Sequence, residues 1–416
     1  MLTFFLQVDI VFSINTTRLV GFMKGECMNA ILKEAFAEKD YVVALRRDFH
    51  AHPELGMEEY RTADRIEEEL NALGIPHERF GKTGVLATIE SGKSGKTLFV
   101  RADIDALPIQ EANDVPYKSQ TPGIMHACGH DGHGAALLGA AKLLVRHKNE
   151  LTGKVLLCFQ PAEEIGGGIQ PLLDSGVLKT VDRVHAIHLS SAFPVGTYTV
   201  KTGAWMASCD YFKITITGKA THGTTPDAGI DSIYIASLLV VQLQSIISRV
   251  ISPVESGVVS VGHFSAGSTY NVIAGNAELE GTARTFNPES RKKIQALIAK
   301  IARNLADDYG AKAEVVFKEY TESVINNADV ATEQIAAAQK LVGKDHVISE
   351  PPKRFGSDNF GNLINASGGK GSYAFVGSNG GAASAVSHHN EHFDIDEDSL
   401  VYATALHVQY ALDFLG

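Results

Sequence analysis

The chain of 416 residues is poor in cysteine, lacks a cluster of basic residues and contains no G-x-S-x-G segment. Its four scattered cysteines exclude a dense disulfide scaffold and favour reduced thiols in a cytoplasm, which is where we expect the protein to work. A net charge of −11 without a lysine- or arginine-rich stretch argues against a nucleic-acid partner. Without a G-x-S-x-G segment, the sequence also lacks the usual sign of a serine nucleophile at a strand-to-helix turn.

The first 27 residues do not fit a targeting or membrane-spanning segment. They lack a basic start and a clear small-residue cleavage site, so we do not interpret them as a signal peptide. Asp9, Asn15 and Arg18 interrupt the apolar residues, which leaves fewer than the ~20 that a membrane span needs. We predict a poorly defined extension over residues 1–27 and no membrane partner.

Two domains are expected, because a chain of this length exceeds the size at which a single hydrophobic core stops growing. Apolar runs such as residues 97–104 and 154–160 alternate with helical patterns, which is typical of an α/β domain with a mostly parallel sheet. From about residue 207 the strands alternate apolar with polar residues, as in YFKITITG. We predict an α/β main domain formed by residues 28–206 and 321–416, with a small α+β domain inserted at residues 207–320.

The densest group of potential metal ligands is the segment MHACGHDGH at residues 125–133. Its imidazole and thiolate groups precede a helix of small residues, and borderline-soft divalent ions prefer such ligands. Cys128 and His130 cannot complete a coordination shell alone. The segment therefore predicts one part of a metal site.

Further candidate ligands follow other predicted strands. The run KVLLCFQPAEE ends in two glutamates, the run RVHAIHLS carries a histidine at its end, and a histidine cluster follows the strand SYAFVG. Since the carboxyl ends of parallel strands meet at one edge of a sheet, we expect these side chains to converge. They are Glu163, Glu164, His188 and the cluster of His388, His389 and His392. One histidine of the cluster is expected to close the coordination shell.

Two adjacent glutamates suit a division of labour, because neighbouring side chains diverge and only one can easily face an ion. The other can take a proton from the attacking water and deliver it to a leaving amine. A divalent ion would activate that water and polarise the carbonyl group under attack.

Three residues of the insert are candidates for contacts with a substrate. Arginine is the usual fork for a carboxylate, and a histidine can stabilise an oxyanion. These candidates are His222, Asn271 and Arg284.

Taken together, the motifs resemble those of the M20 metallopeptidase family, in the amidohydrolase branch that contains hydrolases of N-acyl amino acids, hippurate and plant auxin conjugates. The resemblance extends from about residue 40 to residue 414. It is carried by RRDFHAHPELGMEEYRTA, VRADIDALPIQE, MHACGHDGHGAALLGAA, FQPAEE, AIHLS, GKATHG, EGTARTF, FGSDNF and HFDIDED.

This resemblance implies a role for each candidate. Glu163 would be the general base, and Arg101 stands where other branches carry a histidine two residues before Asp103. The implied metal ligands are Cys128, His130, Glu164, His188 and His389. The insert would be a lid and dimerisation domain, with His222 at the scissile carbonyl group. Asn271 and Arg284 would contact the end of the substrate.

These features predict a metal-dependent amidohydrolase that releases a carboxylic acid and a free amino acid from a small N-acyl amino acid. A dipeptidase or an N-acetyl-diaminopimelate deacetylase would share the same residues, and a metal-dependent binding protein without turnover is the alternative outside enzymes. We expect one or two divalent ions per chain, manganese or zinc before nickel or cobalt. An exposed strand edge in the insert predicts a homodimer.

Overall fold

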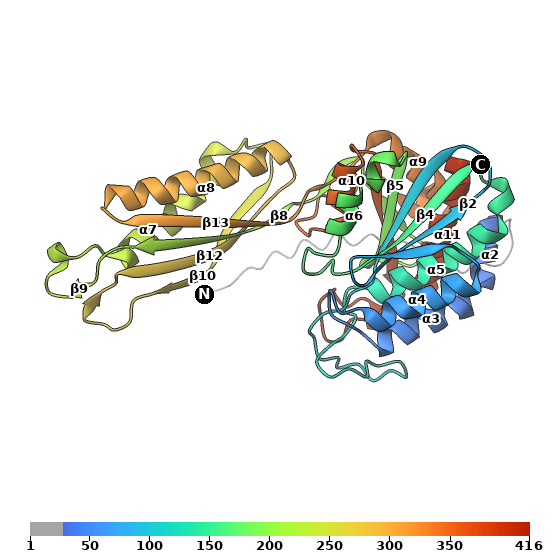
Figure 1. Cartoon of the computed structure of the whole chain (residues 1–416), viewed down its shortest axis with the longest axis horizontal. Coiled ribbons are helices and arrows are strands. Elements are labelled where there is room, and N and C mark those ends of the chain that lie inside the picture. Colours follow the sequence, from blue (N-terminus) through green and yellow to red (C-terminus); the bar gives the residue numbers. More distant parts are fainter. Residues whose placement is uncertain (1–27) are drawn as a thin grey trace.

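The computed structural model describes residues 28–416, so the extension predicted for residues 1–27 lies outside the described part of the chain. Figure 1 shows a larger body around a central sheet and a smaller, elongated body beside it. The chain leaves the larger body after β7 (Gly203–Met206) and returns to it at β14 (Val324–Asn326), and these two strands pair with each other. The smaller body is therefore an insertion.

The larger body is built on an eight-stranded sheet in the order β1-β2-β4-β3-β5-β16-β6-β15. The central strands β4, β3, β5 and β16 run parallel, whereas β1, β2 and β6 add antiparallel pairs. The strands are β1 (His77–Phe80), β2 (Gly84–Glu90), β3 (Lys96–Asp103), β4 (Gly153–Gln160), β5 (Arg183–Pro194), β6 (Tyr198–Val200), β15 (Val347–Ile348) and β16 (Gly371–Asn379).

Helices cover both faces of this sheet, which explains why its parallel strands are continuous apolar runs. In β3, Leu98 and Val100 pack into one core, and Phe99 packs into the other. The helices on the first face are α2 (Ala30–Ala37), α3 (Lys39–Ala51), α4 (Tyr60–Ala72), α5 (His130–Arg146), α9 (Ala328–Val342) and α11 (Asp398–Leu415). Those on the second face are α6 (Gln170–Ser175) and α10 (Phe360–Ala366).

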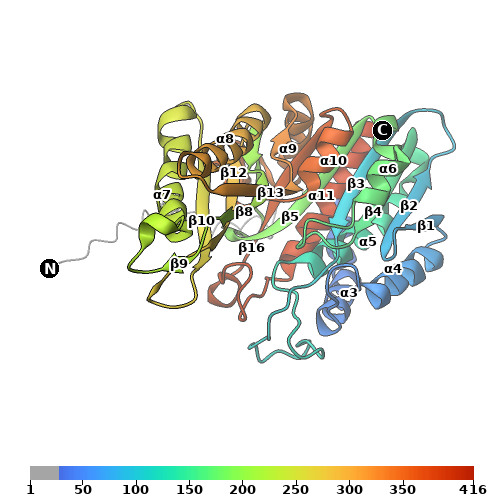
Figure 2. The same ribbon diagram turned by 60° about the vertical axis from the view of Figure 1, so that its left-hand side comes forward.

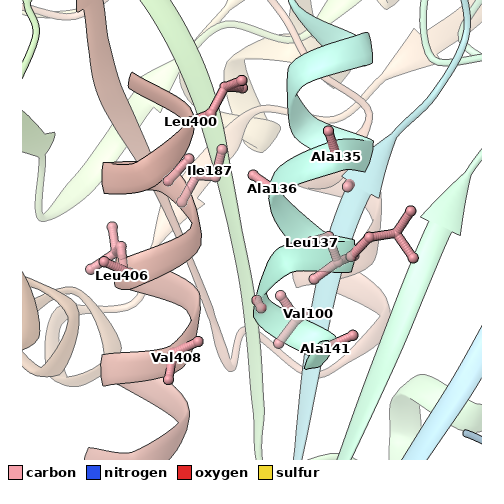
Figure 3. Close-up of a cluster of buried hydrophobic side chains, with 14 of the residues drawn as sticks. Val100, Ala135, Ala136, Leu137, Ala141, Ile187, Leu400, Leu406 and Val408 are labelled. Atoms are coloured by element: carbon pink, nitrogen blue, oxygen red, sulfur yellow. The ribbon is translucent and has the colours of Figure 1, made fainter. Parts of the chain in front are cut away.

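Helix α5 packs closely against its neighbours because small residues line it. Figure 3 shows Ala136 of α5 close to Ile187 of β5, with α11 alongside. A methyl group added to Gly139 would lie 2.6 Å from Val42 Cγ2 on α3, so glycine allows the two helices to approach. This packing fixes the N-terminus of α5, where the CGH segment lies.

The inserted body consists of a four-stranded antiparallel sheet, in the order β10-β12-β8-β13, with two helices on one face (Figure 2). Its elements are β8 (Cys209–Thr217), α7 (Ser232–Ser245), β10 (Gly257–Ala266), β12 (Asn276–Thr285), α8 (Pro288–Asp308) and β13 (Lys312–Thr321). At the end far from the larger body, β9 (Thr221–His222) pairs with β11 (Val272–Ile273) (Figure 1). The predicted fold class is confirmed.

Helix α7 presents an apolar face to solvent. It continues in a π-helical turn, and the combined segment Ser232–Val250 is long and apolar enough to cross a membrane by those two measures. Here it packs on β10, β12 and α8, and it carries no charged residue before Arg249. Tyr234 and Val241 are 51% and 70% exposed. Exposed apolar surface of this kind marks interaction sites.

Candidate metal centre

Cys128 and His130 lie at the start of α5, where the chain turns sharply. Gly129 has a φ of 100°, in the left-handed region that favours glycine. The turn leaves Cys128 half-buried in the preceding loop and makes His130 the first, buried residue of the helix. His130 Nδ1 lies 3.0 Å from the carbonyl oxygen of Asp105, an outer contact that orients the ring and leaves Nε2 facing the other candidate ligands.

A second unusual turn positions the two glutamates. Ala162 follows β4 and has a φ of 57° although it is not glycine. Two hydrogen bonds hold this backbone: Ala162 N donates to Glu59 Oε1 at 2.8 Å, and Glu164 N donates to Asp105 Oδ2 at 2.9 Å. Glu164 then faces His130, with 3.9 Å between Oε1 and Nε2. Glu163 Oε1 instead accepts a hydrogen bond from the backbone N–H of Asn359 at 3.2 Å.

His188 does not lie at the end of its strand, so that part of the prediction is wrong. Strand β5 continues to Pro194. However, its last residue paired with β3 is Ala186, two positions earlier, and beyond that point β5 pairs with β16. His188 therefore lies at the edge that β3 leaves free, and it still meets the residues that follow β3 and β4.

Of the three histidines after β16, His389 is the one that faces Glu164. Its Nε2 lies 3.4 Å from Glu164 Oε1, and its φ of 62° turns it out of an extended path. Both ring nitrogens of His388 are engaged by the backbone, since Nδ1 donates to Cys128 O at 3.0 Å and Nε2 accepts from Ser191 N at 3.4 Å. His392 is exposed beside Glu391. The geometry therefore favours His389 as the ligand.

The donor atoms lie close enough together to hold a divalent ion. Cys128 Sγ lies 3.5 Å from His188 Nε2, and the donors of Cys128, Glu164 and His389 lie within 4.8 Å of one another. His130 Nε2 is buried and has no hydrogen-bond partner in the described part of the chain, which is unusual unless a ligand binds there. Sulfur, nitrogen and oxygen donors together suit a borderline-soft divalent ion.

The thiol of Cys128 also fits a cation site. Burial, together with the negative charge of Glu164, raises the pKa of Cys128 well above its usual value. A divalent cation bound here would reverse this effect, because it would stabilise the thiolate directly. We therefore expect the Cys128 thiol to lose its proton only when it binds an ion.

A buried chain of polar groups supports His188 from behind. His133 Nδ1 donates to Asp103, and His133 Nε2 accepts from Leu189 N at 2.9 Å. The rings of His133 and His188 lie 4.5 Å apart. Arg101 forms ion pairs with Asp103 at 2.7 Å and with Asp358 at 3.1 Å. Arg101 occupies the position at which other branches of the family carry a histidine. Its positive charge balances the negative charges of the buried carboxylates Asp103 and Asp358.

The two adjacent glutamates have opposite electrostatic environments. Burial raises the pKa of Glu163 well above its usual value, and Asp358 and Glu164 reinforce the effect. Burial alone would raise the pKa of Glu164 too, but His389 and His130 outweigh it and the net shift is downward. Glu164 is therefore suited to be a charged ligand, and Glu163 to take up a proton.

A cleft of about 850 Å³ between the two bodies is lined by Cys128, Glu163, Glu164, His188 and His389. Its other wall includes Arg284, Lys318 and Tyr320 of the insert, and Arg354 and Ser357 of the larger body. Arg284 thus lies in the same cleft as the candidate ligands, and its contact with a substrate stays a prediction.

Two neighbours of the site, Asp105 and Arg354, were not predicted as site residues. Asp105 follows β3 within the run ADIDAL, so its place past a strand end could have indicated it. Arg354 lies in an irregular segment with no pattern that could mark it.

Two other predicted substrate residues, His222 and Asn271, do not lie in this cleft. They are at the tip of the insert, where Gly223 N donates to Asn271 O at 2.8 Å. Strand β8, with nine residues, separates the tip from the cleft, which corresponds to about 30 Å at roughly 3.3 Å per residue. Within a single chain, therefore, neither residue is placed to contact a substrate beside Glu163.

The chain is similar to known peptidases and deacetylases. The sequence profile of peptidase family M20/M25/M40 matches residues 99–413. N-acetylcysteine deacetylase of Bacillus subtilis is 38% identical over 376 residues, which cover 89% of this chain and 96% of the deacetylase. Thermostable carboxypeptidase 2 of Saccharolobus solfataricus is 36% identical over 382 residues, covering 90% of this chain and 96% of that protein.

A solved structure is similar over almost the whole described fold. The YXEP protein of Bacillus subtilis, a dinuclear metal-binding peptidase from the M20 family, is 35% identical with a TM-score of 0.79. The match covers 90% of this chain and 98% of that one. The likeness therefore includes both the larger body and the insert.

Proposed function

The chain belongs to peptidase family M20/M25/M40, and we propose that it removes the acyl group from N-acyl amino acids. It is a metal-dependent hydrolase that acts on amide bonds, and its named relatives include a deacetylase of N-acetylcysteine and a carboxypeptidase. One observation carries the proposal: candidate metal ligands gather at a cleft beside Glu163, a glutamate whose pKa is raised.

The proposed ligand set is Cys128, His130, Glu164, His188 and His389. One or two divalent ions held there would activate water and polarise the carbonyl group. The mixed donors support manganese or zinc, with nickel or cobalt as alternatives. The described cysteines Cys128, Cys158 and Cys209 are free thiols, which supports a cytoplasmic location.

Glu163 is proposed to move the proton in both halves of the reaction. Its carboxylate takes a proton from the attacking water as the water oxygen bonds to the carbonyl carbon. The carboxyl group then gives this proton to the amide nitrogen as the carbon–nitrogen bond breaks. The products are a carboxylic acid and an amino acid with a free amine, and Glu163 returns to its starting state.

Arg284 is proposed to bind the carboxylate of the amino-acid half. One of its terminal nitrogens, Nη1, donates to Phe355 O at 3.0 Å and lies 3.3 Å from Ser357 Oγ. These contacts anchor the guanidinium in the cleft wall, and its other donors have no partner among residues 28–416 and can bind a carboxylate.

His222 and Asn271 are proposed to act on a substrate bound in a second copy of the chain. The cleft lies where the insert joins the larger body, since Cys209, Arg284 and Thr321 line it. Rotation about this junction keeps the tip of the insert about 30 Å from the cleft, because the length of β8 does not change. A partner's insert is free of that constraint.

A homodimer is supported by the exposed face of the insert. Helix α7 has no charged residue along its length, and Val241 and Tyr234 are open to solvent. Strand β10 forms the adjacent edge of the insert's sheet, and an unpaired edge is a template for another strand. Burying both features in a two-fold contact would remove apolar surface from water.

Hydrolysis of a small substrate panel tests the proposed function. The metal-free protein would be reloaded with manganese or zinc and offered hippurate, N-acetyl amino acids, an indole-acetyl amino acid and several dipeptides. Metal-dependent release of an amino acid from an acylated substrate is the expected result. Activity on dipeptides alone would make the protein a dipeptidase, and silence on every substrate would favour a binding protein.

A further inference from the structure

Arg354 is a cation in the cleft wall whose backbone is held firmly. It lies in the segment between β15 and α10. Arg354 N donates to Trp205 O at 2.9 Å, and Ala207 N donates to Arg354 O at 3.2 Å, so strand β7 fixes its position. Its side chain lines the same cleft as Cys128 and His188.

The guanidinium of Arg354 has no carboxylate partner within residues 28–416. Arg354 is half-buried, whereas the fully buried arginines of the fold are paired in the ion pairs Arg46–Asp131, Arg101–Asp103 and Arg291–Asp210. The pKa of each of those arginines is raised, whereas burial lowers the pKa of Arg354. Removing a cation from water without a counter-charge costs free energy, which a bound anion would offset.

Two aromatic rings lie beside this guanidinium. Its central carbon lies 4.9 Å from the ring centroid of Phe375 and 5.8 Å from that of Phe193. Nη1 lies 3.5 Å from Ser190 Oγ, which is at most a weak hydrogen bond. Within residues 28–416, most of the five donors therefore have no partner, and their planar arrangement matches a carboxylate.

The fork lies close to the proposed metal ligands. Ser190 follows His188 by two residues on β5, so both side chains point to the same face of the sheet. The ring of Phe375, on which the guanidinium lies, is 5.8 Å from the ring of His188. A group bound by Arg354 would thus belong to the same small molecule whose amide bond lies beside Glu163.

We propose that Arg354 binds a carboxylate of the substrate inside the cleft. The proposal rests on the proposed amidohydrolase function and adds a second carboxylate-binding group to the cleft beside Arg284. The carboxylate is either the α-carboxylate or a side-chain carboxylate of the amino-acid half. With Arg284 and Arg354 in one cleft, substrates that carry two carboxylates are favoured.

Substitution with matched substrates tests this role. R354M keeps an unbranched side chain for the aromatic rings but removes the charge, and R354K keeps the charge but not the fork. K353M is the control, because Lys353 is the preceding residue, lies over the ring of Phe286 and lines a different pocket. The substrates are N-acetylglutamate, N-acetylglutamine and the α-carboxamide of N-acetylglutamine, with thermal melting to confirm folding.

R354M is expected to lower kcat/KM for N-acetylglutamate about 10- to 100-fold, mainly through KM, as expected for lost hydrogen bonds to a charged group. R354K is expected to restore part of the loss and K353M to match the unsubstituted enzyme. If the loss disappears with N-acetylglutamine, Arg354 binds the side-chain carboxylate. If it disappears only with the α-carboxamide, Arg354 binds the α-carboxylate. Both outcomes support the proposal, whereas an equal loss on all three substrates, or no loss on any, overturns it.

Calorimetry separates this proposal from the proposed function. If the unsubstituted, metal-loaded protein hydrolyses none of the substrates, the amidohydrolase assignment fails. Binding of glutarate then still tests Arg354: weaker binding to R354M than to K353M supports a carboxylate site. Equal affinity of the two variants for glutarate overturns it.

Discussion

At the scale of single residues, the contrast between Glu163 and Glu164 defines the chemistry of the cleft. The two side chains are adjacent in sequence, yet one faces Asn359 and Asp358 and the other faces His130 and His389. Environments that drive two carboxyl groups apart in pKa are typical of acid–base pairs with separate roles.

The first prediction follows from this contrast. E163Q is expected to lower kcat by about 10²- to 10⁴-fold, because an amide cannot accept and return a proton. Its bound metal should stay at the level of the unsubstituted protein, since Glu163 is not in the ligand set. Steady-state kinetics with metal analysis by mass spectrometry would check both. Unchanged hydrolysis in E163Q would show that another group carries the proton.

The second prediction concerns the choice among the histidines after β16. H389A is expected to weaken metal binding by more than about 100-fold, beyond the 10- to 100-fold typical of groups that only support a ligand. H392A is the matched control, because His392 is exposed and does not face Glu164. Competition with a chromogenic chelator measures the affinity of each variant. Equal affinities of H389A and H392A would remove His389 from the ligand set.

Which residues the sequence could predict depends on how strongly local pattern constrains them. Cys128, Glu164 and His188 were found because each stands in a dense motif or near a strand end, and parallel strands bring such positions together. The sequence could not predict the position of His222. Its motif is recognisable, but nothing in it indicates that the residue lies about one strand length from the cleft. Arg354 could not be predicted either, because its role depends on the lack of a carboxylate near its guanidinium in the described fold. The spacing of residues along the chain does not indicate this.

At the scale of elements, most helices and strands were predictable because their hydrophobic period matches their surroundings. The apolar runs predicted at residues 97–104 and 154–160 form strands β3 (Lys96–Asp103) and β4 (Gly153–Gln160), which helices cover on both faces. Strand β5 is longer than predicted because its second half pairs only with β16 and carries polar residues such as Ser190 and Ser191. Polar residues are unusual in a buried parallel strand, so sequence alone suggested an end there.

The third prediction concerns the attachment of α2 to the C-terminal end of α5. His147 caps α5, and its nitrogens lie 2.8 Å from Glu34 of α2 and 2.8 Å from Glu150. Burial would lower the pKa of His147, but the two glutamates outweigh it and the net shift is upward. Because the pKa of His147 is higher in the folded state, its charged form stabilises the fold. This stabilisation is complete below the unfolded pKa near 6.5, and it is lost as the pH rises through the pKa of the folded state.

H147Q is therefore expected to reduce the free energy of unfolding by about 0.5–1 kcal/mol at pH 6 and by much less at pH 9, since the pair is partly exposed. Urea unfolding at the two pH values measures the difference. A deficit of the same size at both would mean that packing, not charge, explains the effect of His147.

At the scale of the whole molecule, the insert carries its candidate substrate contacts at two distant places, although the sequence suggested that they act together. Its root forms part of the cleft through Arg284, and its tip carries His222 at a distance of about one strand. Between them, α7 and β10 form an uncharged outer face. The homodimer proposed above would explain both features.

The fourth prediction tests the face itself. V241E is expected to convert a homodimer into monomers, because a charge would have to be buried in an apolar contact. V316E is the control: Val316 is also exposed, but it lies on β13 at the opposite edge of the sheet. Light scattering with size exclusion gives the mass of each variant. A dimer that persists in V241E but not in V316E would place the contact at the other edge.

The last prediction is that an active site needs residues from both subunits of the proposed homodimer. E163Q and H222A are each expected to be nearly inactive, for different reasons. If the tip of one subunit serves the cleft of the other, a mixed dimer contains one complete site, with Glu163 from the H222A chain and His222 from the E163Q chain. Random mixing makes about half of the dimers mixed, so about a quarter of all sites should recover. Co-expression with two affinity tags isolates the mixed dimer. If His222 acted within its own chain, both sites would lack one residue, and the mixed dimer would be as inactive as its parents.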